Sequence, residues 1–156
     1  MKMKTTFKLL VFSLFVLSAC SKDSNSNPTP TPVVKTVEEL LTQKTWKADE
    51  VRIQLSNNTT QYYKHGGSSN TANYDSDSLK FNTNNTGTYY YNSIATSITW
   101  NFINAEKSKM TITINYTPTP LTINWEYINV TESALKYTQY VTGSVSYLAS
   151  GTRVPN

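Results

Sequence analysis

Apolar and polar side chains alternate strictly along three segments in the second half of the chain. The segments are Ser97–Phe102, Met110–Tyr116 and Leu121–Tyr127. A period of two is typical of a β-strand with one face buried and the other in contact with water. The pattern therefore predicts three antiparallel strands that share an apolar interior.

Weaker alternation predicts further strands on both sides of these segments. The additional candidates are residues 46–55, 59–64, 78–82, 86–91 and 135–141. The first of them changes parity near Asp49 and Glu50, and a β-bulge at that point would keep its apolar side chains on one face.

A short helix is expected before the first strand, at about residues 37–43. Thr36 and Glu39 have the spacing of a capping box, in which each side chain binds a backbone N–H of the other residue. Val37, Leu40 and Leu41 then fall on one face of the helix. This apolar face is expected to pack against another part of the domain.

The connections between the predicted strands are short, apart from His65–Asp77. Short hairpin links in sequence order favour a meander, and eight such strands close most simply into an up-and-down barrel. The prediction is an all-β, eight-stranded antiparallel barrel with a short N-terminal helix. A β-sandwich is the alternative, because it shares the alternation but needs longer crossovers.

Four segments resemble the lipocalin-like domains of small bacterial lipoproteins. They read LLTQKTWKADEVRI, DSLKFNTNNTGTYY, ITWNFINAEKSKMTITI and TINWEYINVTESALKYTQYV. Lipocalins usually carry Gly two residues before the first-strand Trp, and here that position is Lys44. The resemblance covers about residues 36–148 and implies a lipocalin-like fold more than an activity; the barrel domain is expected at residues 36–156. If the barrel has a cavity, its aromatic walls suit a small hydrophobic or amphipathic ligand.

The N-terminus has the layout of a secretory signal. Lys2, Lys4 and Lys8 precede an apolar run that is too short to span a bilayer. The run ends in Leu17–Cys20, with the sequence LSAC, which resembles the lipobox of bacterial lipoproteins. The resemblance implies a signal peptide at residues 1–19 and acylation of Cys20 with chains such as palmitate. An ordinary secretory signal with an incidental thiol is the alternative.

Residues 21–35 are expected to form a tether between Cys20 and the barrel. They are rich in Ser and Asn and then in Pro, a composition typical of extended spacers. The expected location is the envelope of a Gram-negative bacterium, anchored to the outer membrane on its periplasmic or surface face. Retention in the inner membrane remains open.

Charge and composition exclude several classes of function. The chain has 14 basic and 10 acidic residues, and removal of residues 1–19 takes away three Lys and leaves 11 against 10, or +1. This small excess gives no support to nucleic-acid binding. One Cys and one His exclude an internal disulfide and make a His/Cys zinc site untenable. We expect no cofactor.

The predicted strand faces give a set of candidate ligand-binding side chains in the barrel lumen. The set is Trp46, Phe81, Tyr89, Tyr91, Trp100, Phe102, Trp125, Tyr127, Tyr137 and Gln139. An eight-stranded interior is either filled by side chains or holds one small ligand. A cavity with its mouth beneath the loop at 65–77 would indicate ligand binding. A filled interior would instead indicate a protein- or glycan-interaction module.

His65 is the single candidate for acid–base chemistry. A catalytic His needs an orienting acid and a reacting partner, and Asp75 and Asp77 are near it in sequence. A polar cleft uniting these groups would indicate an enzyme. We expect a solvated loop His and a binding protein without catalytic activity.

Overall fold

The computed structural model describes residues 33–141 and 147–156, and the regular elements of this part are strands apart from one short helix. The elements are α1 (Val37–Thr42), β1 (Thr45–Leu55), β2 (Thr60–Lys64), β3 (Ser78–Phe81), β4 (Thr86–Tyr91), β5 (Ile94–Phe102), β6 (Met110–Ile114), β7 (Leu121–Val130), β8 (Leu135–Val141) and β9 (Tyr147–Pro155). Every strand pair is antiparallel, and β3 to β9 follow one another in sequence order. Within the described residues, no helix is long and apolar enough to cross a membrane.

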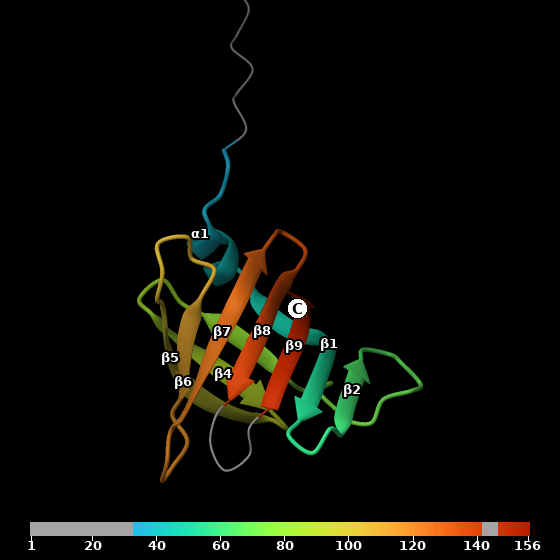
Figure 1. The fold of residues 1–156 in the computed structure, drawn as a ribbon. Helices are drawn as coiled ribbons and strands as arrows, with labels where there is room; N and C mark the ends of the chain where they lie inside the picture. Colours follow the sequence, from blue (N-terminus) through green and yellow to red (C-terminus); the bar gives the residue numbers. More distant parts are fainter. Residues whose placement is uncertain (1–32, 142–146) are drawn as a thin grey trace, which may run out of the picture. The chain divides into compact units, whose positions relative to one another are not determined.

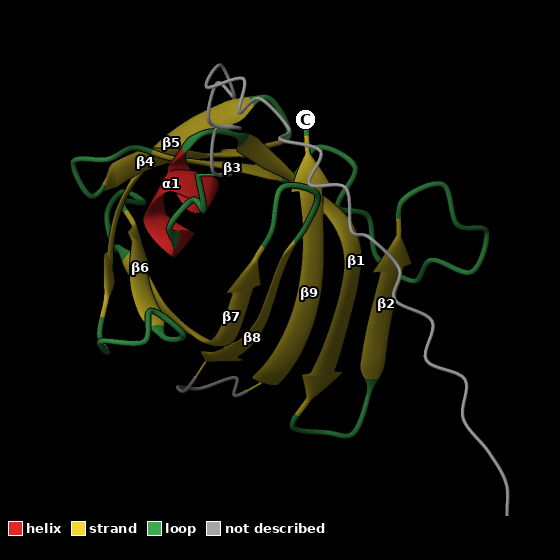
Figure 2. Cartoon of the chain, turned by 90° about the horizontal axis from the view of Figure 1, so that it is seen from above, coloured by secondary structure: helices red, strands yellow, loops and turns green. Residues whose placement is uncertain are grey.

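Eight of the nine strands form a closed barrel (Figures 1 and 2). The barrel closes because β1 pairs along its length with β9, from Trp46 opposite Pro155 to Leu55 opposite Tyr147. On its other edge, β1 pairs with β3 through Thr45–Lys47. The predicted all-β, eight-stranded antiparallel barrel is therefore confirmed.

The strands that make up the barrel differ in two places from the prediction. The segment predicted at 59–64 is β2, which pairs with Glu50–Gln54 of β1 as an extra strand outside the closed ring. The ring is completed by β9, which the alternation did not predict. The inward positions of β9 are Ala149, Gly151 and Arg153, so the strand lacks the large apolar side chains that reveal a buried face.

The change of parity in the first strand is a β-bulge, as predicted. The register of β1 against β9 shifts between Ala48 and Glu50. Trp46 and Ala48 before the shift and Val51 after it are all buried. The extra residue thus keeps both halves of β1 facing the interior.

The helix α1 closes one end of the barrel (Figure 2). Thr36 and Glu39 form the expected capping box, with Glu39 N donating to Thr36 Oγ1 at 3.2 Å and Thr36 N donating to Glu39 Oε2 at 2.7 Å. Leu41 is fully buried, and its carbonyl accepts the indole N–H of Trp46 at 2.8 Å. The helix therefore acts as a plug for the apolar interior.

The main core fills the part of the barrel next to this plug. Phe81 lies at its centre, with edge-to-face contacts to Trp100 and Trp125 at centroid distances of 5.6 and 6.2 Å. A smaller cluster of Ala48, Val51 and Tyr63 lies beneath β2 and the following loop. The interior is thus packed at one end and has room for a cavity only at the other.

Candidate functional site

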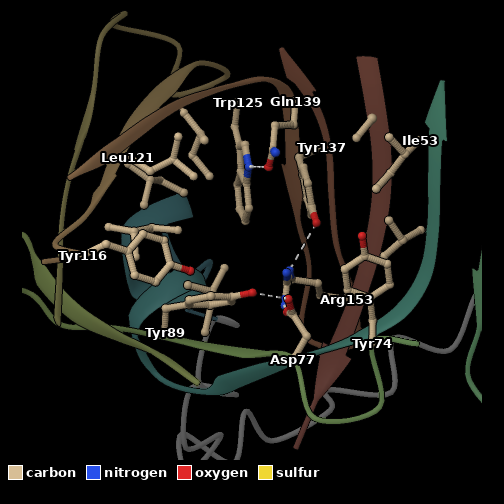
Figure 3. A pocket seen from close by; sticks show the side chains of 16 residues that line it. Ile53, Tyr74, Asp77, Tyr89, Tyr116, Leu121, Trp125, Tyr137, Gln139 and Arg153 are labelled. Carbon is tan, nitrogen blue, oxygen red and sulfur yellow. Dashed lines mark hydrogen bonds and ion pairs between the residues drawn. The ribbon is translucent and has the colours of Figure 1, made fainter. Parts of the chain in front are cut away.

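A cavity of about 210 Å³ occupies the barrel interior at the end away from α1 (Figure 3). Leu121 at the start of β7, Gln139 near the end of β8 and Ile53 near the end of β1 belong to its wall. Tyr74 and Asp77 of the loop between β2 and β3 line it as well, which fits the position expected for the mouth. Tyr116 and Leu121 are exposed at its rim.

The floor of the cavity is a buried ion pair between Asp77 and Arg153. These residues are 4% and 5% exposed, and Asp77 Oδ1 lies 2.5 Å from Arg153 Nη1. This contact lacks hydrogen-bond geometry, so Asp77 Oδ1 is a buried oxygen without a hydrogen bond in the described part of the chain. Two buried charges are tolerated here because each compensates the other.

Two phenols and one backbone carbonyl complete this floor. Tyr89 donates its hydroxyl hydrogen to Asp77 Oδ2 at 2.9 Å. Arg153 donates from Nε to the Tyr137 hydroxyl oxygen at 3.3 Å and from Nη1 to the Trp46 carbonyl at 3.4 Å. The dashed lines in Figure 3 join Tyr89 to Asp77 and Arg153 to Tyr137.

The surroundings of these groups fix their protonation. Burial, followed by the negative charge of Asp77, raises the pKa of Tyr89 far above its usual value. Burial also raises the pKa of Tyr137, and the adjacent Arg153 offsets only part of this effect. For Arg153, burial lowers the pKa, but Asp77 and Tyr137 outweigh it and the net change is upward. The floor therefore carries neutral phenols beside a permanently charged guanidinium.

One wall of the cavity is a stack of two aromatic rings. Trp125 and Tyr137 lie with their centroids 3.7 Å apart and their planes 10° from parallel. The Trp125 indole N–H donates to Gln139 Oε1 at 2.8 Å. The wall thus offers a flat apolar surface, and the indole hydrogen is already bound.

The residues predicted for the lumen fall into three groups. Tyr89, Trp125, Tyr137 and Gln139 line the cavity. The core next to α1 contains four others, namely Trp46, Phe81, Trp100 and Phe102. These four belong to the interior but do not line the cavity.

The third group lies at the surface. Tyr91 is 38% exposed and stacks on Tyr89 at a centroid distance of 6.3 Å. Tyr127 is 71% exposed, so the prediction that it faces the lumen is wrong. The register of β7 against β8 shifts between Glu126 and Asn129, and Tyr127 has φ 53°. This bulge turns Tyr127 outward and places Ile128 in the interior.

Sequence reasoning missed the charged half of the site. The sequence places Asp77 near His65 but does not indicate a partner at Arg153. A single Arg near the end of a chain gives no sign of burial, because its partner lies 76 positions earlier and is identified only by the fold. Gly151, two residues before Arg153, is the one local hint that β9 approaches another group closely.

The structure does bring His65 to Asp75, but at the surface. His65 Nδ1 lies 3.4 Å from Asp75 Oδ1, which also accepts the Tyr63 hydroxyl hydrogen at 2.7 Å. His65 and Asp75 are both exposed, and neither lines the cavity. Asp77 points away from this pair to Arg153. Among the described residues, no group of three or more His, Cys, Asp or Glu side chains could hold a metal ion.

Comparison of the chain with protein-family models, with curated proteins and with solved structures finds no match. The functional argument therefore depends on the barrel and its cavity. The predicted signal peptide, Cys20 and most of the tether lie outside the described residues.

Proposed function

We propose that this protein is a lipid-anchored envelope lipoprotein whose barrel binds a small hydrophobic or amphipathic molecule without catalysis. The observation that carries the proposal is the cavity at the end of the barrel away from α1, with its apolar wall and polar floor. Concave sites with mainly apolar walls and a few placed polar groups are typical of small-molecule binding. The cavity weighs against the alternative of an interaction module with a filled interior.

The size of the cavity limits the ligand. At about 210 Å³ it is smaller than the roughly 300–1,000 Å³ of sites for drug-sized ligands. An apolar cavity of about 150 Å³ is known to accept benzene. The ligand we propose is therefore a molecule with one ring or a short chain.

The ends of the barrel differ in a way that suits an anchored binding protein. The described chain enters the barrel through Lys35 and α1, at the plugged end, whereas the cavity lies at the other end. Acyl chains on Cys20 would hold the protein stably at a bilayer, because two or more lipid chains suffice for that.

Native mass spectrometry of the protein purified from its host tests the binding function. We expect a co-purifying small molecule on a fraction of the protein. Ala149→Leu, which adds bulk at a buried cavity position, should abolish the extra mass, and Ser150→Leu on the exposed face should retain it. An extra mass that is the same in both variants would contradict binding in the cavity.

Fractionation of the host membrane tests the anchor separately. The protein should be recovered with membranes and should incorporate a labelled palmitate analogue, and Cys20→Ser should prevent both. Recovery of the wild-type protein with an unmodified Cys20 would refute the anchor and leave the proposal for the cavity intact.

A further inference from the structure

The hydrogen-bond donors and acceptors that line the cavity indicate which polar group a ligand must carry. This inference rests on the proposed binding function. Three of the oxygen atoms at the site already accept hydrogen bonds from the protein. Asp77 Oδ2 accepts from Tyr89, Gln139 Oε1 accepts from Trp125, and the Tyr137 hydroxyl oxygen accepts from Arg153. Asp77 Oδ1 accepts no hydrogen bond, but it lies 2.5 Å from Arg153 Nη1, so the ion pair occupies this oxygen as well.

Two phenol hydrogens remain available as donors. The Tyr137 hydroxyl accepts from Arg153, but its own hydrogen has no acceptor among the described residues. The Tyr116 hydroxyl points into the cavity and likewise has no partner in the part of the chain that the structure describes (Figure 3). Burial raises the pKa of both groups, so both hydrogens are retained at any ordinary pH. The cavity therefore offers donors to a ligand.

The charges of the floor disfavour a charged ligand of either sign. Asp77 and Arg153 are paired at 2.5 Å, so their charges cancel within the protein. A carboxylate beside this pair would be attracted by Arg153 but repelled by Asp77, and for an ammonium the two effects are reversed. The pair therefore offers a charged ligand no net attraction that would offset its lost hydration.

We propose that the ligand presents a neutral hydrogen-bond acceptor, such as the carbonyl oxygen of a ketone, ester or amide, to the phenol hydrogen of Tyr137. Its apolar part then lies against Trp125 and nearby aliphatic side chains such as Leu121. The ligand class is a small apolar molecule with a carbonyl head group.

Four probes of matched size test this inference: acetophenone, ethylbenzene, benzoate and benzylamine. Binding is followed by ¹H–¹⁵N NMR of the indole N–H groups of the ¹⁵N-labelled protein. Trp125 lines the cavity, whereas the indoles of Trp46 and Trp100 bind backbone carbonyls in the core. Only the Trp125 signal should therefore move with the concentration of a bound probe.

The expected order has acetophenone first. One neutral hydrogen bond should make it bind roughly 3- to 10-fold more tightly than ethylbenzene, and the two charged probes should bind more weakly than either. Tyr137→Phe should bring the ratio of acetophenone to ethylbenzene to about one while ethylbenzene binding persists. Tyr127→Phe, on the exposed bulge, should leave the ratio unchanged.

The outcomes separate this inference from the proposed function. If benzoate or benzylamine binds most tightly, or if acetophenone has no advantage over ethylbenzene, the carbonyl head group is refuted while binding in the cavity stands. If no probe moves the Trp125 signal, the binding function fails and this inference with it. The ranking on the wild-type protein decides the question even if Tyr137→Phe does not fold.

Discussion

At the scale of single residues, Gly151 determines the form of the aromatic wall. A Cβ atom at this position would lie 2.4 Å from Tyr137 Cζ and 2.5 Å from its hydroxyl oxygen. We expect Gly151→Ala to displace the Tyr137 ring from Trp125 and to lower the free energy of unfolding by about 1–3 kcal/mol. Urea unfolding measures the change, with Ser150→Ala on the exposed face as the control. Equal stability of the two variants would show that the ring has room to move.

The ion pair of Asp77 and Arg153 permits a second residue-scale prediction. Removal of one partner leaves the other charge buried without compensation, so Asp77→Asn should lower the free energy of unfolding by about 3–5 kcal/mol. Lys109→Ala, which breaks the partly exposed pair with Glu126, should cost about 1 kcal/mol or less.

A double-mutant cycle separates the pair from its surroundings. Asp77→Leu combined with Arg153→Met removes both charges, and the double variant should be more stable than the sum of the two single losses predicts. Additive losses in chemical denaturation would contradict a direct coupling of the two charges.

At the scale of elements, the sequence predicts strands well where one face is apolar. Alternating Ile and Trp residues mark β5, β6 and the first part of β7, and the capping box marks α1. This pattern does not predict β9, because the inward positions of that strand hold Ala149, Gly151 and Arg153. Closure of the barrel was predicted correctly from the number of strands. The predicted ring of eight strands included β2, however, whereas the ring in the structure contains β9 instead.

The site residues were also predicted only where they belong to a strand with an apolar face. Tyr89, Trp125 and Tyr137 are found at the cavity because alternation, strict around Trp125 and weaker around the two Tyr residues, places them inside. Whether an inward side chain lines the cavity or fills the core depends on its distance from the end that α1 closes. Alternation predicts which side chains point inward but not this distance. Arg153 and Asp77 meet only through the pairing of β1 with β3 and β9.

The bulge in β7 is an element-scale feature with a measurable cost. Tyr127 has φ 53°, a conformation that Asn adopts readily and β-branched residues adopt poorly. Because Tyr127 is exposed, substitution there costs little packing. Tyr127→Asn should be as stable as the wild type or more stable, and Tyr127→Val should be less stable than Tyr127→Asn by about 1–2 kcal/mol.

Thermal or urea unfolding of the two variants measures this difference. Asn129→Val serves as the control, because Asn129 is exposed on the same strand but is not among the residues with positive φ. If the substitutions at 127 and 129 have the same effect, the backbone conformation at Tyr127 carries no cost.

At the scale of the whole molecule, the two ends of the barrel differ. One end is closed by α1 and stabilised by ion pairs, and the other contains the cavity. The closed end joins three parts that are distant in sequence: the segment before α1, the segment after it and the turn between β7 and β8. Lys35 Nζ lies 2.6 Å from Glu132 Oε1, and Lys44 Nζ lies 2.9 Å from Glu132 Oε2. Lys44 also donates to the Glu132 backbone carbonyl. Glu132 therefore links the helical plug to the barrel wall.

This linkage should give the protein a characteristic response to acid. Hydrogen bonds from Lys35 and Lys44 lower the pKa of Glu132 from 4.5 to about 2. Because the folded state has the lower pKa, the stabilisation is complete above about pH 4.5 and is lost as the pH falls toward 2. Glu132→Gln should therefore be less stable than the wild type at pH 7, and the difference should become small at pH 2 and disappear below it. Urea unfolding across this range measures it, and added salt should reduce the difference at pH 7, since these side chains are partly exposed.

Glu106→Gln, at an exposed Glu for which the structure shows no ion pair with any described residue, should show no such convergence. A gap between wild type and Glu132→Gln that stays constant down to pH 2 would mean that the carboxylate charge does not hold the plug in place.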